Sequence, residues 1–191
     1  SADILPYNAK FLPKDKAQFK PIEMTRDVAA RFHAKLGDTF VLPEAKVQES
    51  SMYVPGTDGA KMSKSKGNTI DLFQSDKALR KQIMGIQTDS TPMEDPKDPD
   101  TDNVFALYKI LATPAQTAAM RDHYTGGNYG FGHAKQALYE LILDQFNPAR
   151  ERFEYFMNHT EEIDKALAVG AEKAALIANS VLTRVREKVG Y

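Results

Sequence analysis

Residues 59–68 read Gly-Ala-Lys-Met-Ser-Lys-Ser-Lys-Gly-Asn, a short stretch in which cationic side chains alternate with hydroxyl groups. The lysines supply ammonium charges, the serines supply hydroxyls, and the glycines let the backbone bend close to a ligand. A polyanion with several free oxygens, such as a triphosphate, is the chemical complement of this pattern. A solvated, lysine-rich surface loop is the ordinary alternative for a run of charges.

The segments around this loop have the pattern of a mixed α/β layer. A strand at 51–54 is predicted just before the loop and a helix at 75–85 just after it. Further upstream, the spacing of apolar residues predicts a helix over 22–36 that Gly37 ends. Extended segments are predicted at 10–13, 39–42 and 46–54. A helix between strands indicates a piece of an α/β sheet.

Residues 89–102 form the clearest boundary, because their prolines and acids predict an extended connector. Everything after this connector is predicted to be helical, at 103–112, 114–124 and 133–157, with Pro148 as a kink or break. Thr160 is the expected N-cap of a last helix. The buried stripe expected on that helix consists of Ile163, Leu167, Gly170, Ala174, Ile177, Val181, Val185 and Val189. We therefore expect one domain over 1–88, a linker over 89–102 and a helical domain over 103–191.

Composition excludes several classes of site. The 191-residue chain is 42% hydrophobic, has a formal net charge of -1 and contains no cysteine. Disulfides, cysteine-ligated zinc and thiol catalysis are thereby excluded. The histidines show no metal-ligand spacing, so no protein-bound metal is predicted. No apolar run of membrane-spanning length and no signal peptide is evident, so we expect a cytoplasmic protein with no membrane partner.

The central five residues of the loop carry a resemblance to a known family. Residues 61–65 spell KMSKS, the signature of class I aminoacyl-tRNA synthetases, and essentially the whole chain resembles the C-terminal part of bacterial tryptophanyl-tRNA synthetases. The resemblance also rests on Ala-Asp-Ile-Leu at 2–5, Ile-Glu-Met-Thr-Arg-Asp at 22–27 and Pro-Met-Glu-Asp-Pro-Lys-Asp-Pro at 92–99. It implies the C-terminal half of a Rossmann-like nucleotide-binding domain over 1–88 and a helical anticodon-binding domain over 103–191.

The implied activity is that of a ligase. Such an enzyme uses ATP, accompanied by Mg²⁺, to activate tryptophan as its adenylate and then transfers it to tRNA(Trp), and the full-length family is homodimeric. In the family the loop lysines stabilise charge developing on pyrophosphate, so Lys61 and Lys64 are the expected catalytic residues. The other expected nucleotide contacts are Met52, Met62, Ser63 and Ser65.

Two residues are expected to bind tryptophan. Indole has one polar atom, which only donates, and the resemblance implies that Asp3 is its acceptor. An acid that caps a turn is the commoner role of an isolated aspartate. Gln18 matches a family position that holds the polar end of the amino acid. Around it, the family's glycine, aspartate and histidine are replaced by Asp15, Ala17 and Pro21.

The other family signature, His-x-Gly-His, is absent. Gly-Phe-Gly-His at 130–133 lies among the predicted helices, where we expect only the start of a helix. The chain alone is therefore expected not to complete aminoacylation. A non-catalytic synthetase-like module that binds tRNA or protein is the alternative. The altered residues at 15–21 favour this module, whereas the intact lysines of the loop favour the ligase.

Overall fold

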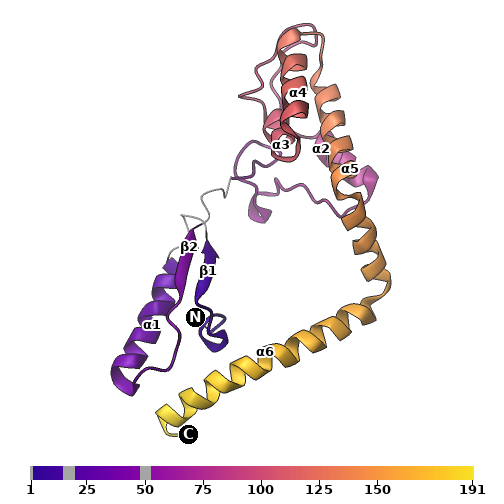
Figure 1. Ribbon diagram of the computed structural model, residues 1–191. Coiled ribbons are helices and arrows are strands. Elements are labelled where there is room, and N and C mark those ends of the chain that lie inside the picture. The colour runs from indigo at the N-terminus through magenta and orange to yellow at the C-terminus, as the bar shows by residue number, and fades with distance from the viewer. Residues whose placement is uncertain (1, 15–19, 48–52) are drawn as a thin grey trace. The chain divides into compact units, whose positions relative to one another are not determined.

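The computed structural model describes residues 2–14, 20–47 and 53–191, and it is mostly helical with a small parallel sheet (Figure 1). The chain divides into two compact units. One consists of Ser1–Ser51 with His159–Tyr191, and the other is Met52–Asn158. In this grouping the last helix goes with the N-terminal residues, and the loop of residues 59–68 goes with the helices that follow it.

The first unit contains a β-α-β arrangement. Strands β1 (Phe11–Lys14) and β2 (Glu44–Val47) pair in parallel, with Phe11 opposite Glu44, and helix α1 (Lys20–Leu36) lies between them in the chain. Parallel strands need such a crossover, because a tight turn cannot join them. Gly37 ends α1 with φ of 82°, as predicted. The extended segment predicted at 10–13 is confirmed by β1.

The strand predicted at 39–42 is wrong, since this segment is irregular. In this segment and just after it, side chains of α1 make hydrogen bonds with backbone N–H and C=O groups, which in a strand would have paired with a neighbouring strand. The Phe40 N–H donates to Nε2 of His33 over 3.0 Å, and Nη1 of Arg26 donates to the Pro43 carbonyl over 2.7 Å. Of the strand predicted at 46–54, the structure forms only the part within β2; residues 48–52 lie outside the described ranges, and residues 53–54 are irregular.

Helix α6 (Thr160–Val189) completes the first unit and packs against the short 3₁₀ helix η1 (Leu5–Tyr7). Its N-cap is His159 and not Thr160. The expected buried stripe is also wrong: Val181 is buried, but Leu167 and Ile177 are 65% and 47% exposed. Among the described residues, α6 is long and apolar enough to cross a membrane, judged by length and composition only. The sequence did not predict this, because charged residues interrupt the apolar residues of this segment.

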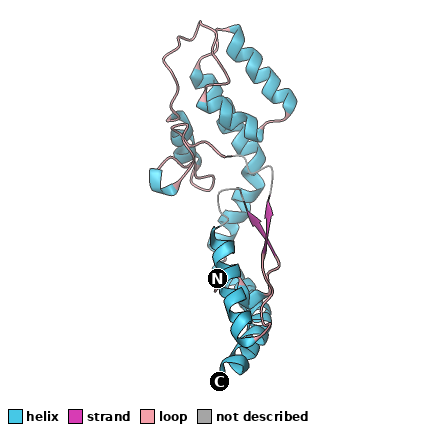
Figure 2. Ribbon diagram, turned by 90° about the vertical axis from the view of Figure 1, so that its left-hand side faces the viewer, coloured by secondary structure: helices cyan, strands magenta, loops and turns pink. Residues whose placement is uncertain are grey.

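The second unit packs four helices around one core (Figure 2): α2 (Asp76–Met84), α3 (Asn103–Leu111), α4 (Pro114–Gly126) and α5 (Phe131–Asn158). Helix α5 contacts both α2 and α3. Pro148 lies inside α5 and does not end it. The buried core residues are Leu79, Ile83, Ile86, Val104, Phe105, Leu107, Tyr108, Met120, Tyr124, Ala134, Leu138, Leu141 and Ile142. The helices predicted at 75–85, 103–112 and 114–124 are thereby confirmed within one or two residues.

Residues 89–102 form neither helix nor strand, as predicted, but they are packed against the second unit. Lys97 is only 5% exposed, and its Nζ donates to the carbonyls of Pro92 (2.7 Å), Asp95 (3.0 Å) and Met93 (3.3 Å). The Lys97 N–H donates to the Tyr124 carbonyl over 2.7 Å. Since a buried cation organises this segment and backbone bonding attaches it to α4, it is an ordered part of the unit.

Candidate functional site

The lysine-rich loop is held at the end of a tight turn in the second unit. Pro55 and Lys61 form an isolated antiparallel bridge. The Gly56 N–H donates to the Ala60 carbonyl over 2.7 Å, and the Met62 N–H donates to the Val54 carbonyl over 3.0 Å. Gly59, at φ of 77°, supplies the left-handed conformation that closes the turn. The backbone on both sides of the turn is therefore fixed by hydrogen bonds.

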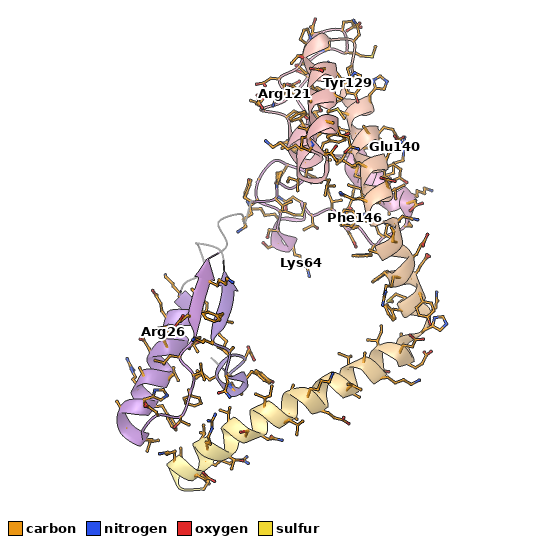
Figure 3. All side chains as sticks on the ribbon, in the orientation of Figure 1. Arg26, Lys64, Arg121, Tyr129, Glu140 and Phe146 are labelled. Carbon is orange, nitrogen blue, oxygen red and sulfur yellow. The ribbon has the colours of Figure 1, made fainter. Side chains whose placement is uncertain are left out.

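Residues 63–67 present the cationic side chains. The 3₁₀ helix η2 (Lys64–Lys66) follows Ser63 and ends at Gly67, which has φ of 65°. The Ser63 and Ser65 hydroxyls share a hydrogen bond of 2.8 Å. Figure 3 shows the Lys64 side chain directed away from the body of its unit. Among the described residues, the ion pairs are His33–Asp38, Arg121–Asp100 and Arg150–Asp76, so none of them engages the exposed lysines of the loop.

One carboxylate lies beside the loop. Asp58 accepts hydrogen bonds at Oδ1 from Nδ2 of Asn68 over 2.7 Å and from the Ala60 N–H over 3.0 Å. The Asn68 hydrogen bond holds the pKa of Asp58 below its usual range, and the Ala60 N–H and the charge of Lys66 act in the same direction. Asp58 therefore stays ionised at neutral pH, but its Oδ1 is occupied by the turn itself.

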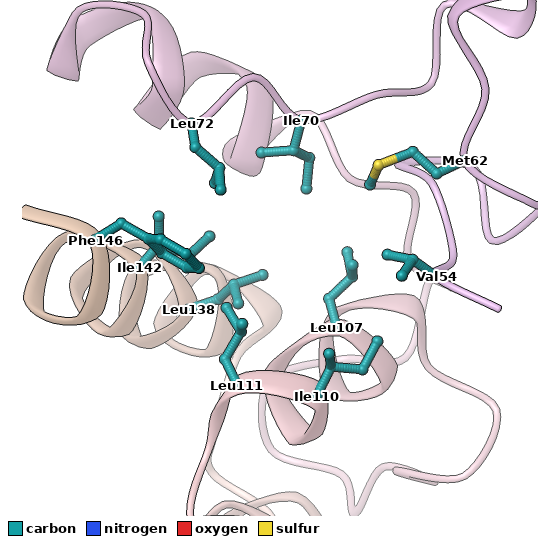
Figure 4. A pocket seen from close by; sticks show the side chains of 10 residues that line it. All are labelled: Val54, Met62, Ile70, Leu72, Leu107, Ile110, Leu111, Leu138, Ile142 and Phe146. Carbon is teal, nitrogen blue, oxygen red and sulfur yellow. The ribbon is translucent and has the colours of Figure 1, made fainter. Parts of the chain in front are cut away.

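Met62 is the residue of the KMSKS stretch that faces inward. Its side chain lies at an apolar cavity of about 150 Å³ (Figure 4). Residues of the loop region line one side of this cavity, and residues of α3 and α5 line the other. The full lining is Val54, Met62, Ile70, Leu72, Leu107, Ile110, Leu111, Leu138, Ile142 and Phe146. Met62 thus attaches the loop to the helical core, while Lys61 and Lys64 are exposed to solvent.

The predicted site residues are not all brought together. Lys61, Met62, Ser63, Lys64 and Ser65 lie in one loop. Asp3 is exposed and belongs to the other compact unit. Gln18 and Met52 lie outside the described residues. The Gly130–His133 segment is the start of α5, as predicted, with His133 Nδ1 accepting from the Gly130 N–H over 3.3 Å.

Sequence reasoning assigned no role to Asn68 or Asp58, which organise the loop. The sequence offered one signal: Asn68 lies two residues before the apolar Ile70. An asparagine side chain that is buried beside apolar residues must find hydrogen-bond partners. No cluster of three or more histidine, aspartate or glutamate side chains suitable for a metal occurs in the part of the chain that the structure describes. The site offers hydrogen-bond donors and positive charge, which suit an anionic ligand.

Comparison with known proteins finds consistent similarities. A model of the family "tRNA synthetases class I (W and Y)" matches residues 1–147. The tryptophan–tRNA ligase of Rhodopirellula baltica is 45% identical over 190 residues, covering 100% of this chain and 59% of the relative. The enzyme of the same name from Campylobacter jejuni is 40% identical, with 100% and 60% covered.

Solved structures agree with these sequence similarities. The C. jejuni tryptophanyl-tRNA synthetase, solved in complex with ADP and tryptophan, superposes with a TM-score of 0.93 at 40% identity. That match covers 99% of this chain and 59% of the solved one. The synthetase of Mycoplasma pneumoniae, at 21% identity and a TM-score of 0.68, shares the fold. The chain thus spans about three-fifths of the length of these relatives.

Proposed function

This chain belongs to the class I tRNA synthetases for tryptophan and tyrosine, and on that premise we propose that it is part of a tryptophan–tRNA ligase. The enzyme would activate tryptophan with ATP and transfer it to tRNA(Trp). The relatives named tryptophan–tRNA ligase, and the neighbour solved with ADP and tryptophan, support this choice of substrates. The observation that carries the proposal is a hydrogen-bonded turn that presents exposed lysines to solvent, outside the ion pairs found in the part of the chain that the structure describes.

The first reaction step explains why such a loop is useful. An oxygen of the tryptophan carboxylate forms a bond to the α-phosphorus of ATP. The bond between that phosphorus and the bridging oxygen breaks, and pyrophosphate leaves with the electron pair. Negative charge therefore grows on the leaving oxygens, where Lys61 and Lys64 would donate hydrogen bonds. Donors aimed at developing charge from a fixed backbone stabilise the transition state most effectively.

The remaining loop residues would assist in different ways. One of the Ser63 and Ser65 hydroxyls donates to the other, so the accepting hydroxyl keeps its hydrogen, which it would donate to a phosphate oxygen when nucleotide binds. Met62 would hold the loop against the cavity wall. Mg²⁺ would arrive with the nucleotide, because the phosphates supply the oxygen ligands that it prefers and Oδ1 of Asp58 is already engaged by Asn68 and Ala60.

We extend the proposal to the two regions of the chain. Residues 1–88 would form the C-terminal half of a Rossmann-like domain, supported by the parallel β1-α1-β2 arrangement. Residues 103–191 would form the helical anticodon-binding domain. Asp3 would accept from the indole N–H, Gln18 would hold the amino acid's polar end, and Met52 would contact the nucleotide. The complete enzyme would be a cytoplasmic homodimer.

The test is tryptophan-dependent exchange of pyrophosphate into ATP by the full protein that carries this sequence. We expect Lys61→Met and Lys64→Met each to lower kcat by roughly 100- to 1,000-fold, as for loss of a transition-state donor. The KM for tryptophan should change little, because neither lysine is expected to touch the amino acid. Lys77→Met, at an exposed lysine of α2, is the matched control.

Two results would contradict the proposal. Wild-type exchange by the double variant of Lys61 and Lys64 would show that the loop does not stabilise the leaving pyrophosphate. An absence of exchange in the unmodified full protein, together with tight tRNA binding, would favour the non-catalytic module instead.

A further inference from the structure

We propose that Asn68 is the positioning residue of the cationic loop, and that its side-chain amide sets the direction in which Lys61 and Lys64 present their ammonium groups. This inference rests on the proposed phosphate-binding function of the loop. Asn68 follows the KMSKS residues by three positions and is only 3% exposed, so it would not itself touch the nucleotide. Its effect would pass through the backbone of the residues that do.

The amide of Asn68 uses its hydrogen-bonding capacity within the loop. Nδ2 donates to Oδ1 of Asp58 over 2.7 Å and to the Lys61 carbonyl over 3.2 Å. Oδ1 accepts from the Ser63 N–H over 2.8 Å. An asparagine side chain offers two donor hydrogens and one acceptor oxygen, and all are engaged here. The amide therefore fixes the peptide groups on both sides of Met62, between the two proposed catalytic lysines.

The backbone of Asn68 connects this arrangement to the rest of the unit. Its carbonyl accepts from the Thr57 N–H over 3.0 Å, and the Thr57 carbonyl accepts from the Gln87 N–H over 2.8 Å. Gly56 allows this close approach, because a β-carbon there would collide with the side-chain amide of Asn68 and would lie 2.7 Å from the backbone carbonyl oxygen of Asn68. The position of the loop is thus tied to the segment that follows α2.

The hydrogen bonds at this position require a side-chain amide. The group must donate to a carboxylate and a carbonyl and must also accept from an N–H. An aspartate would keep the acceptor, lose both donors and bring a second negative charge against Asp58, which costs free energy. An apolar residue would leave the Ser63 N–H and the Lys61 carbonyl without these partners. We therefore expect Asn68→Asp to release the loop while changing the volume of the side chain very little.

The experiment measures tryptophan-dependent pyrophosphate exchange by the full protein. Asn68→Asp should lower kcat by roughly 10- to 100-fold, as expected for a misplacement of about 1 Å, with little change in the KM for tryptophan. Asn158→Asp, at an exposed asparagine that ends α5, is the matched control. Should Asn68→Asp fail to fold, Asp58→Ala removes one of the same hydrogen bonds at an exposed residue and should lower kcat in the same direction by a smaller factor.

Two further variants separate positioning from a merely structural role. Exchanging the partners, as Asp58→Asn with Asn68→Asp, keeps the net charge and restores one hydrogen bond between them, so it should recover part of the lost kcat. In protein that already carries Lys61→Met and Lys64→Met, Asn68→Asp should have little further effect, because the groups that it positions are gone.

The outcomes distinguish this inference from the function on which it rests. If the lysine variants keep full exchange activity, the proposed function fails. If the lysine variants are impaired but Asn68→Asp matches its control, the function stands and the inference is overturned. The inference would also be overturned by two results together. Asn68→Asp would lower kcat by the same factor in the lysine variants as in the unmodified protein, and the double variant Asp58→Asn with Asn68→Asp would recover none of the lost kcat.

Discussion

The hydroxyl of Tyr124 donates a 2.8 Å hydrogen bond to Oδ1 of Asp102, and that same oxygen accepts the Phe105 N–H over 2.8 Å at the start of α3. Tyr124 is 1% exposed and Asp102 is 8% exposed. Burial, followed by the charge of Asp102 and this hydrogen bond, raises the pKa of Tyr124 far above its usual value. The hydroxyl therefore remains a donor throughout the physiological range and links α4 to the N-cap of α3.

Tyr124→Phe should destabilise the protein by about 1–3 kcal/mol, because the buried carboxylate loses one of its two donors. The packing of the ring against Phe105, with centroids 5.5 Å apart, would remain. Urea unfolding measures the change, and Tyr139→Phe is the control, since this half-buried tyrosine shows no side-chain hydrogen bond among the described residues. Equal midpoints for the two variants would contradict the assigned role of the Asp102 contact.

A second carboxylate of the same segment makes stability depend on pH. Asp100 accepts two hydrogen bonds from Arg121, from Nη1 over 3.0 Å and from Nη2 over 2.6 Å. This contact holds the pKa of Asp100 below its usual range. Because the folded pKa is lower than the unfolded one, the stabilisation is complete above about pH 4 and is lost as the pH falls through the folded value.

We therefore expect Asp100→Asn to lower the Tm at pH 7 and to have progressively less effect at acidic pH. Thermal unfolding of both proteins between pH 7 and pH 2 measures this convergence. Asp122→Asn, at an exposed acid on α4 outside the pair, is the control. A difference in Tm that stays constant down to pH 2 would show that the carboxylate charge is not its cause.

The buried ammonium of Lys97 holds the 92–97 segment in its folded shape. Besides the carbonyls it donates to, its Nζ lies 5.4 Å from the centroid of the Phe131 ring. Lys97→Met keeps the length of the side chain but leaves three part-buried backbone carbonyls without this donor, so a loss of roughly 1–3 kcal/mol is expected. Faster hydrogen exchange at the backbone N–H of residue 97 in Lys97→Met would show that the effect lies in this segment. Lys109→Met, at an exposed lysine, is the control. Unchanged exchange and stability would contradict it.

Local signals in the sequence were sufficient for most helix boundaries. Ser75 caps α2, and Thr113 with Pro114 begins α4 through a capping box with Gln116, because such residues satisfy backbone groups within one turn of the chain. The cationic loop was equally accessible, because its three lysines lie within six residues of one another. What these features share is that their partners lie only a few residues away.

Features that depend on distant partners were missed. Lys97 sits in a stretch of acids and prolines that reads as a solvated linker, and only its packing against Phe131 and Tyr124 shows that it is buried. Leu167 recurs at helical spacing in α6, yet periodicity cannot tell whether another segment covers that face. Asn68 belongs to the stretch that was identified, but its role depends on Asp58 and Gly56, on the other side of the turn.

The junction between α4 and α5 offers the sharpest test of backbone geometry. Gly127 has φ of 72° and ψ of -179°, a conformation that is essentially restricted to glycine. A β-carbon at Gly127 would also lie 2.5 Å from the Glu94 carbonyl oxygen, which accepts the Asn128 N–H. Gly127→Ala should therefore cost at least about 1–3 kcal/mol. The adjacent Gly126 ends α4, and a β-carbon there would meet nothing within 4 Å.

Gly126→Ala is consequently a control at the neighbouring position, and it should leave stability unchanged or raise it by up to about 1 kcal/mol through the higher helix propensity of alanine. The two variants add the same methyl group at adjacent positions. They therefore have the same composition, and a difference between their urea midpoints reports only the position of the methyl group. A small or reversed difference would contradict both the glycine-restricted conformation of residue 127 and the packing of the Glu94 carbonyl against this turn.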